Sequence, residues 1–167
     1  MLRTQDLIHT NVLTVRSDLP VTELEQLLVR EGISGMPVLE DGELCGVVSR
    51  SDIIRVLASA EGDAGATLAY YQEIAGAARG PRSATHMASE RIAALTVRDI
   101  MTRELITVAG DQPVREMAQT LVSRGVHRVL VTAGRRLLGI VTTLDLVRAI
   151  ADGRIGEESP VRQGDPT

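Results

Sequence analysis

Residues 32–52 read GISGMPVLEDGELCGVVSRSD, and residues 125–145 read GVHRVLVTAGRRLLGIVTTLD. Laying one over the other, with an offset of 125 − 32 = 93, puts glycine on glycine at the first position and aspartate on aspartate at the last. The same register runs without a gap from residues 6–58 over 99–151. Because a fixed period over that length marks an internal repeat, we interpret the chain as a tandem duplication.

Each copy predicts the same order of elements. Residues 12–15 are rich in β-branched side chains, which favours a short strand. Pro20 then favours a helix start, and Gly32 a helix end. Apolar residues spaced as on one helical face lie between them, Val21, Leu24 and Leu28, and their counterparts in the second copy are Val114, Met117 and Leu121.

Two further strands and a second helix complete the copy. Residues 36–39 and 44–48 are expected to form two strands, joined by a turn at Asp41-Gly42, a dipeptide typical of tight hairpins. The second copy predicts strands at 129–132 and 137–141, with a turn near Gly134. A closing helix carries apolar side chains in each copy, Ile53, Ile54 and Leu57 in the first and Leu146, Val147 and Ile150 in the second. The expected fold class is therefore α/β (α+β), with the order β-α-β-β-α occurring twice.

The composition excludes several classes of function. The 167 residues are 44% hydrophobic and 24% charged, as in a soluble globular protein, and the net charge of −4 disfavours nucleic acid as a partner. No apolar run is long enough to span a membrane. The single cysteine, Cys45, fits a cytoplasmic location. Tyr70 and Tyr71 are the only aromatic residues, so aliphatic side chains would have to hold any bound base.

In its order of elements and its motifs the chain resembles the CBS domain family. The residues that carry the resemblance are GISGMPV at 32–38 and GVVSRSD at 46–52, their copies in the second repeat, and VRDIM at 97–101. The resemblance implies two repeats packed sheet to sheet with pseudo-twofold symmetry, as in a Bateman module, and such modules commonly form homodimers.

We expect four segments along the chain. Residues 1–58 form the first CBS repeat and 96–152 the second. Residues 59–95 are an insert, in which Leu68, Tyr71, Ala75 and Ala78 share one helical face. The insert is interpreted as a connector or, alternatively, as a lid or dimer contact that uses the tyrosines. Residues 153–167 are expected to form a flexible C-terminal tail.

Ser49-x-x-Asp52 and Thr142-x-x-Asp145 each stand where a strand is expected to give way to a helix. The spacing is that of a capping box, a purely structural device. A helix N-terminus can also bind phosphate, and a nearby carboxylate can accept hydrogen bonds from ribose hydroxyls. The resemblance implies the second role, with the hydroxyl on phosphate or ribose and the aspartate on ribose. The two readings are compatible.

His127-Arg128 precedes the middle strand of the second repeat, where the first repeat has Ser34-Gly35. The resemblance implies that Arg128 reaches a ligand phosphate, for which its planar guanidinium is suited. The alternative is that Arg128 pairs with a surface carboxylate and that His127 is a partly buried neutral side chain. Either way, the two repeats offer unequal sites.

Candidates for the base pocket lie at the start of the first strand and before the middle strand of each repeat. They are Val12, Met36, Pro37, Leu105, Ile106 and Val129. Core packing is the alternative for each of them. Leu130 departs from the proline usual in the family, which Pro37 keeps, and this alters the expected shape of one pocket.

The sequence offers no sign of catalysis or of a metal site. Its three histidines, His9, His86 and His127, have no ligand-type spacing, and no nucleophile–base set stands in a plausible register. Thr96 and Asp99 are interpreted as a further helix cap. We therefore expect a protein that is not an enzyme and needs no cofactor.

The leading hypothesis is a regulatory module that binds an adenine nucleotide in the cleft between its repeats and signals to an effector protein. AMP, ADP or ATP is favoured, since Arg128 would read phosphate, with NAD and S-adenosylmethionine as further possibilities. The alternative is a ligand-free dimerising scaffold, for which the capping role of both motifs suffices.

Overall fold

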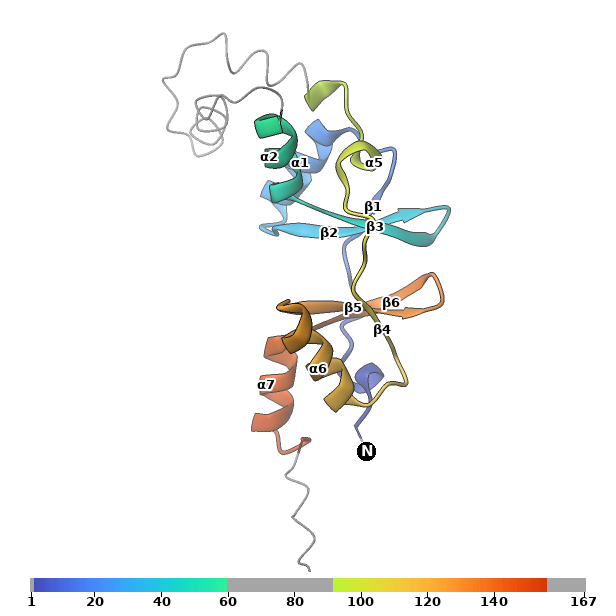
Figure 1. The fold of residues 1–167 in the computed structure, drawn as a ribbon, viewed down its shortest axis with the longest axis vertical. Coiled ribbons are helices and arrows are strands. Elements are labelled where there is room, and N and C mark those ends of the chain that lie inside the picture. The colour runs from blue at the N-terminus through green and yellow to red at the C-terminus, as the bar shows by residue number, and fades with distance from the viewer. Residues whose placement is uncertain (1, 60–91, 156–167) are drawn as a thin grey trace, which may run out of the picture. The chain divides into compact units, whose positions relative to one another are not determined.

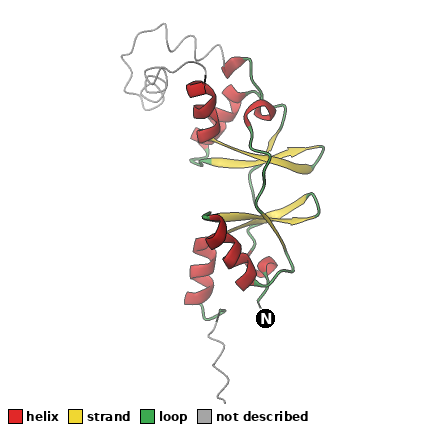
Figure 2. Ribbon diagram, in the orientation of Figure 1, coloured by secondary structure: helices red, strands yellow, loops and turns green. Residues whose placement is uncertain are grey.

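In a computed structural model of the chain, residues 2–59 and 92–155 are described. They form two compact units. The first-repeat unit contains residues 11–59, 92–105 and 134–137, and the second-repeat unit contains 2–10, 106–133 and 138–155. In each unit the helices cover one face of a three-stranded sheet (Figure 1, Figure 2).

The first-repeat unit has the sheet order β1-β2-β3. β1 runs parallel to β2, and β2 and β3 form an antiparallel hairpin. The elements are β1 (Val15–Arg16), α1 (Val21–Arg30), β2 (Gly35–Glu40), β3 (Glu43–Ser49), α2 (Arg50–Ser59) and α5 (Val97–Ile100).

The second-repeat unit repeats this plan with the sheet order β4-β5-β6 and a parallel β4–β5 pair. Its elements are the 3-10 helix η1 (Thr4–Leu7), β4 (Thr107–Ala109), α6 (Val114–Arg124), β5 (Arg128–Ala133), β6 (Arg136–Thr142) and α7 (Thr143–Ala151), and the first two residues of β6 group with the first-repeat unit. The expected β-α-β-β-α order is confirmed in both copies.

The predicted helical faces form the two cores. Val21, Leu24 and Leu28 of α1 are buried against β2 and β3 residues such as Val38 and Val48. Their counterparts on α6 are buried in the core of the second-repeat unit. Proline stands just before each helix, so the apolar face begins in the first turn.

Backbone signals in the loops are also confirmed. Gly125 ends α6 with φ 63°, the left-handed conformation that favours glycine at a helix C-terminus. Asp41 and Gly42 turn the β2–β3 hairpin with φ 52° and 83°. Two positive φ values in succession fit a two-residue hairpin turn matched to the twist of its strands.

The first strand of each copy was predicted too early. β1 covers only Val15–Arg16, which pair with Val38 and Leu39, and β4 begins at Thr107. Residues 11–14 precede the paired edge, and Leu13 is 46% exposed. Local β propensity was therefore overridden by where the neighbouring strand β2 offers a partner.

The segments that precede β1 and β4 each pack in the unit of the other repeat. Residues 2–10, which include η1, belong to the second-repeat unit, and 92–105, which include α5, belong to the first-repeat unit. The bridges obey the offset of 93: Arg3 to Pro113 and His9 to Ile140 in one unit, Pro20 to Thr96 and Val47 to Thr102 in the other. We call these two segments the exchanged lead-ins.

The expected insert helix at Leu68–Ala78 lies outside the described residues. Of the insert, Ile92 is buried in the core of the first-repeat unit. Of the tail, Ile155 packs against the core of the second-repeat unit, and Arg154 donates to the carbonyl of Asp6 at 2.9 Å. The four segment boundaries stay predictions.

Candidate functional site

Ser49 and Asp52 meet where β3 passes directly into α2. The amide and the hydroxyl of Ser49 both donate to Oδ2 of Asp52 at 2.7 Å. Oδ1 accepts from Nη2 of Arg55 at 2.8 Å and from the hydroxyl of Thr102 at 3.3 Å. Asp52 is buried, so these donors replace the water that an exposed carboxylate would have.

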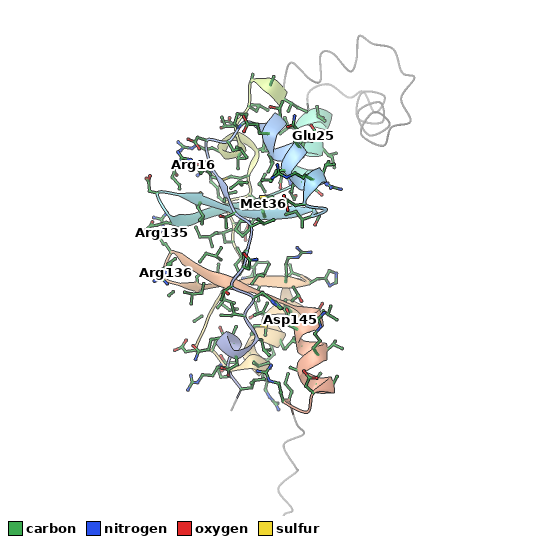
Figure 3. All side chains as sticks on the ribbon, turned by 180° about the vertical axis from the view of Figure 1, so that it is seen from behind. Arg16, Glu25, Met36, Arg135, Arg136 and Asp145 are labelled. Atoms are coloured by element: carbon green, nitrogen blue, oxygen red, sulfur yellow. The ribbon has the colours of Figure 1, made fainter. Side chains whose placement is uncertain are left out.

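Thr142 and Asp145 repeat this geometry where β6 passes into α7, near whose start Figure 3 labels Asp145. The amide and the hydroxyl of Thr142 donate to Oδ2 of Asp145 at 2.7 Å. Oδ1 lies 2.7 Å from Nε2 of His9 and 3.8 Å from Nη1 of Arg148. The capping role weighed for this motif is therefore present, and it holds the carboxylate at the N-terminus of the helix.

The surroundings of Asp145 act on its pKa in opposite directions. Burial raises the pKa, because it disfavours the charged form. Hydrogen bonds from His9 and Thr142 lower the pKa and outweigh burial, so that it lies below the ordinary value of 3.8. Asp145 is thus an ionised acceptor at neutral pH.

His9 is a residue of this site that sequence reasoning missed. It lies on an exchanged lead-in, 136 positions before Asp145, and no local motif joins the two. The alignment of the repeats held a signal, however. His9 aligns with Thr102, and each donates toward the aspartate of the opposite copy's motif.

His127 and Arg128 lie beside the same helix start. The amide of Thr143 donates to the carbonyl of His127 at 3.0 Å, which ties the start of β5 to the start of α7. Both side chains are exposed, and within residues 2–59 and 92–155 neither has a hydrogen bond or an ion pair. Among the described residues, Arg128 therefore does not pair with a surface carboxylate, and His127 is exposed rather than partly buried.

The base-pocket candidates divide by burial. Met36, labelled on β2 in Figure 3, and Val129 are core residues, and Pro37 is also buried. Val12, Leu105 and Ile106 are half-buried. Core packing thus accounts for Met36 and Val129, while the partly open side chains keep apolar surface that a base could contact.

A hollow of about 320 Å³ lies elsewhere in the first-repeat unit, near the β2–β3 turn. Its lining residues are Arg16, Ser17, Asp18, Leu39, Glu40, Asp41, Gly42 and Arg98. Arg98 bonds the buried Ser17 and pairs with Glu40, so it fastens α5 to the sheet. The hollow includes neither Ser49 nor Asp52.

The described residues hold no group of three or more side chains suited to bind a metal ion. Among their helices, none has the length and apolar character needed to cross a membrane.

Comparison with known proteins follows this geometry. The family model of the CBS domain matches residues 5–59 and 97–152. The protein MJ1426 of Methanocaldococcus jannaschii is 29% identical over 83% of this chain and 85% of its own length. The A-adding tRNA nucleotidyltransferase of Geobacter sulfurreducens is 24% identical over 93% of this chain, which spans only 14% of that enzyme.

Solved structures share the fold. The CBS domain of a CBS domain containing membrane protein from Sphaerobacter thermophilus has a TM-score of 0.69 at 24% identity, covering 89% of this chain and 87% of its own. The CBS domain pair of protein MJ0100, in complex with 5-methylthioadenosine and S-adenosyl-L-methionine, has a TM-score of 0.60 at 23% identity, covering 89% and 99%. With two matched segments and two equivalent sheets, the chain is a tandem CBS domain pair and belongs to the CBS domain family.

Proposed function

We propose that this CBS pair is a regulatory module that binds an adenine nucleotide at its Ser/Thr-x-x-Asp motifs. The observation that carries the proposal is the pair of equivalent helix starts, each with a buried carboxylate fixed by its own Ser or Thr. A carboxylate can accept hydrogen bonds from ribose hydroxyls, and the N-terminus of a helix favours the binding of phosphate. The adenosine ligands named for the MJ0100 pair support the same ligand class.

Arg128 favours a phosphorylated ligand at the second-repeat site. Arg128 is exposed and has no ion pair with a described carboxylate, and its neighbour His127 is hydrogen-bonded through the backbone to Thr143 at the start of α7. A phosphate placed there would gain charge-assisted hydrogen bonds without breaking an ion pair. AMP, ADP or ATP is therefore preferred over S-adenosylmethionine, and the first repeat, with Gly35 at the equivalent position, provides no such group.

The proposal makes the module a cytoplasmic sensor that signals to a separate effector protein and catalyses no reaction itself. A nucleotide can shift the module between two forms only by its difference in affinity for them. The solved structure of protein MJ1225 from Methanocaldococcus jannaschii, described as an archaeal homolog of g-AMPK, has a TM-score of 0.66 at 20% identity and covers 89% of this chain and 47% of its own, in keeping with a regulatory role.

Thermal unfolding with and without AMP, ADP, ATP, NAD and S-adenosylmethionine tests the proposal. A ligand at 100 times its Kd adds about 2.7 kcal/mol and should raise Tm by roughly 5–10 °C. We expect the largest rise with a phosphorylated nucleotide and a smaller one in Arg128→Ala. The control is Arg124→Ala, which removes an exposed arginine at the end of α6. No rise with any of the five, in protein freed of bound nucleotide, would rule the proposal out.

A ligand-free homodimeric scaffold is the second candidate, and one observation favours it. α7 leaves three large apolar side chains open: Leu144, Val147 and Ile150 are 53%, 58% and 59% exposed. They are three residues apart and so lie along one side of the helix. Apolar rows of this kind mark interaction surfaces, and a second copy of the chain is the partner that the family resemblance favours.

A further inference from the structure

His9 covers the carboxylate that the proposed nucleotide would use. The side chain of Asp145 is 7% exposed, whereas that of His9 is 56% exposed and lies 2.7 Å away through Nε2. Oδ2 of Asp145 already accepts two donors from Thr142. A ribose hydroxyl must therefore approach Oδ1, where the imidazole of His9 already takes one of the two acceptor positions of that oxygen.

The equivalent carboxylate in the first-repeat unit has a different cover. Oδ1 of Asp52 accepts from Thr102 at 3.3 Å and from Arg55 at 2.8 Å. Neither side chain changes its charge near neutral pH, since a threonine does not titrate there and an arginine stays protonated. Among the side chains that donate to Oδ1 of the two aspartates, the aligned pair His9 and Thr102 places a histidine at one site and a threonine at the other.

The strength of the His9 cover depends on its protonation. A neutral imidazole donates to the Asp145 carboxylate a hydrogen bond in which only the acceptor is charged, whereas an imidazolium adds the attraction between two opposite charges and holds the carboxylate more strongly. Histidine is the side chain that changes charge between about pH 5 and 8. Among the described residues, Arg148 lies 3.8 Å from the same oxygen, and the exposed His127 and Arg128 stand at the start of β5, which is hydrogen-bonded to the start of α7.

We propose that His9 determines the specificity of the Asp145 site, because it competes with the ribose for Oδ1 and makes nucleotide binding there weaken as the pH falls. The Asp52 site, covered by Thr102, has no histidine on its carboxylate and lacks this contribution to the pH dependence. This inference rests on the proposed function, and it makes the module's two sites respond differently to acidification.

Titration calorimetry with AMP at pH 7.5 and 5.5 tests the inference. Asp52→Asn isolates the Asp145 site, and Asp145→Asn isolates the Asp52 site. In the Asp52→Asn protein we compare the native His9 with His9→Thr, which introduces the residue found at the aligned position, Thr102. Because both proteins meet the same ligand, the titration of the AMP phosphate cancels in the ratio of their Kd values. Circular dichroism checks that each variant is folded.

We expect that ratio, His9 over His9→Thr, to rise about fivefold to tenfold between pH 7.5 and 5.5. Thr102→His in the Asp145→Asn background should transfer the same dependence to the Asp52 site. When His127→Gln is added to both proteins, the ratio of their Kd values should keep the same pH dependence, even if each Kd changes. A ratio that stays constant, or a Kd that falls on acidification because imidazolium attracts phosphate, would overturn the inference.

The two failures are distinguishable. AMP that binds at both isolated sites with a constant ratio contradicts the role of His9 and leaves the proposed function standing. AMP, ADP and ATP that bind at neither site, in folded wild-type protein, contradict both.

Discussion

Gly139 of β6 and His9 of the exchanged lead-in approach so closely that a Cβ on the glycine would lie 2.4 Å from the carbonyl oxygen of His9. Ile8 would be met at 2.2 Å as well. The contact accompanies the antiparallel bridge in which His9 and Ile140 exchange backbone hydrogen bonds of 3.0 and 3.1 Å. At the aligned position Gly46, a Cβ would meet Met101 at 2.7 Å. In each unit, the absence of a side chain at this glycine leaves room for the exchanged lead-in to lie against the sheet.

Gly139→Ala should destabilise the protein by about 1–3 kcal/mol, because backbone atoms cannot yield to the added methyl group as a flexible side chain would. Urea unfolding measures the change. Gly110→Ala is the matched control, since its Cβ would meet only ordinary contacts at 3.5 Å and beyond, and it should be neutral or slightly stabilising. Equal stabilities for the two variants would contradict the close approach.

Thr142→Ala should cost about 1 kcal/mol of stability, because it deletes one of the two donors to Asp145 at the start of α7. The urea midpoint should fall while the slope of the transition stays unchanged. Thr143→Ala, which deletes the same atoms from the exposed next residue, should change stability by less than about 0.5 kcal/mol. If both variants lose the same amount, the hydroxyl of Thr142 is not the cause.

Asp145→Asn should lower stability at neutral pH by roughly 1–2 kcal/mol, because an amide accepts the bonds of His9 and Thr142 more weakly than a carboxylate does. The pKa of Asp145 is below 3.8 in the folded protein. Its contribution is therefore present above that ordinary value and is lost as the pH falls through the lower, folded-state pKa. The gap between wild type and variant should close in strong acid.

Urea midpoints measured from pH 6 down to the acid transition would follow that gap. Asp111→Asn, at an exposed aspartate, provides the control and should show no comparable closing. A gap that widens in acid would contradict the lowered pKa.

Val147→Lys with Ile150→Lys should turn a dimer of the chain into a monomer, because each lysine places a charge on the apolar row of α7. Sedimentation velocity over a range of concentrations measures the state. Val29→Lys, at a 53% exposed position of α1, is the control and should leave the dimer intact. A wild-type chain that is monomeric at every concentration would remove the support for a homodimeric scaffold.

Much of the fold could be predicted because its signals are local. The spacing of Val21, Leu24 and Leu28 predicts the buried face of α1, and the Asp41-Gly42 dipeptide predicts the hairpin turn. The start of β1 could not be predicted in this way, since it depends on where β2 offers a partner. Local propensity at residues 12–14 says nothing of that register.

The candidate site was predictable only in part, for the same reason. Ser49 with Asp52 and Thr142 with Asp145 are joined by three-residue spacing, and the structure brings each pair together. His9 contacts Asp145 because its lead-in packs in the unit of the other repeat, and no short spacing in the sequence indicates that contact. The mismatch of His9 with Thr102 is one of many between the aligned repeats, so the sequence alone did not single it out.

The exchange of lead-ins has a consequence for the ancestry of the chain. If one repeat once existed as a separate polypeptide, its first ten residues had no place in its own core and could be satisfied only by a sister molecule. Two such molecules would have traded arms in the manner of a domain-swapped dimer. Gene fusion would then have converted a concentration-dependent partnership into a permanent one, in which residues 2–10 and 92–105 keep the exchanged places that they occupy here.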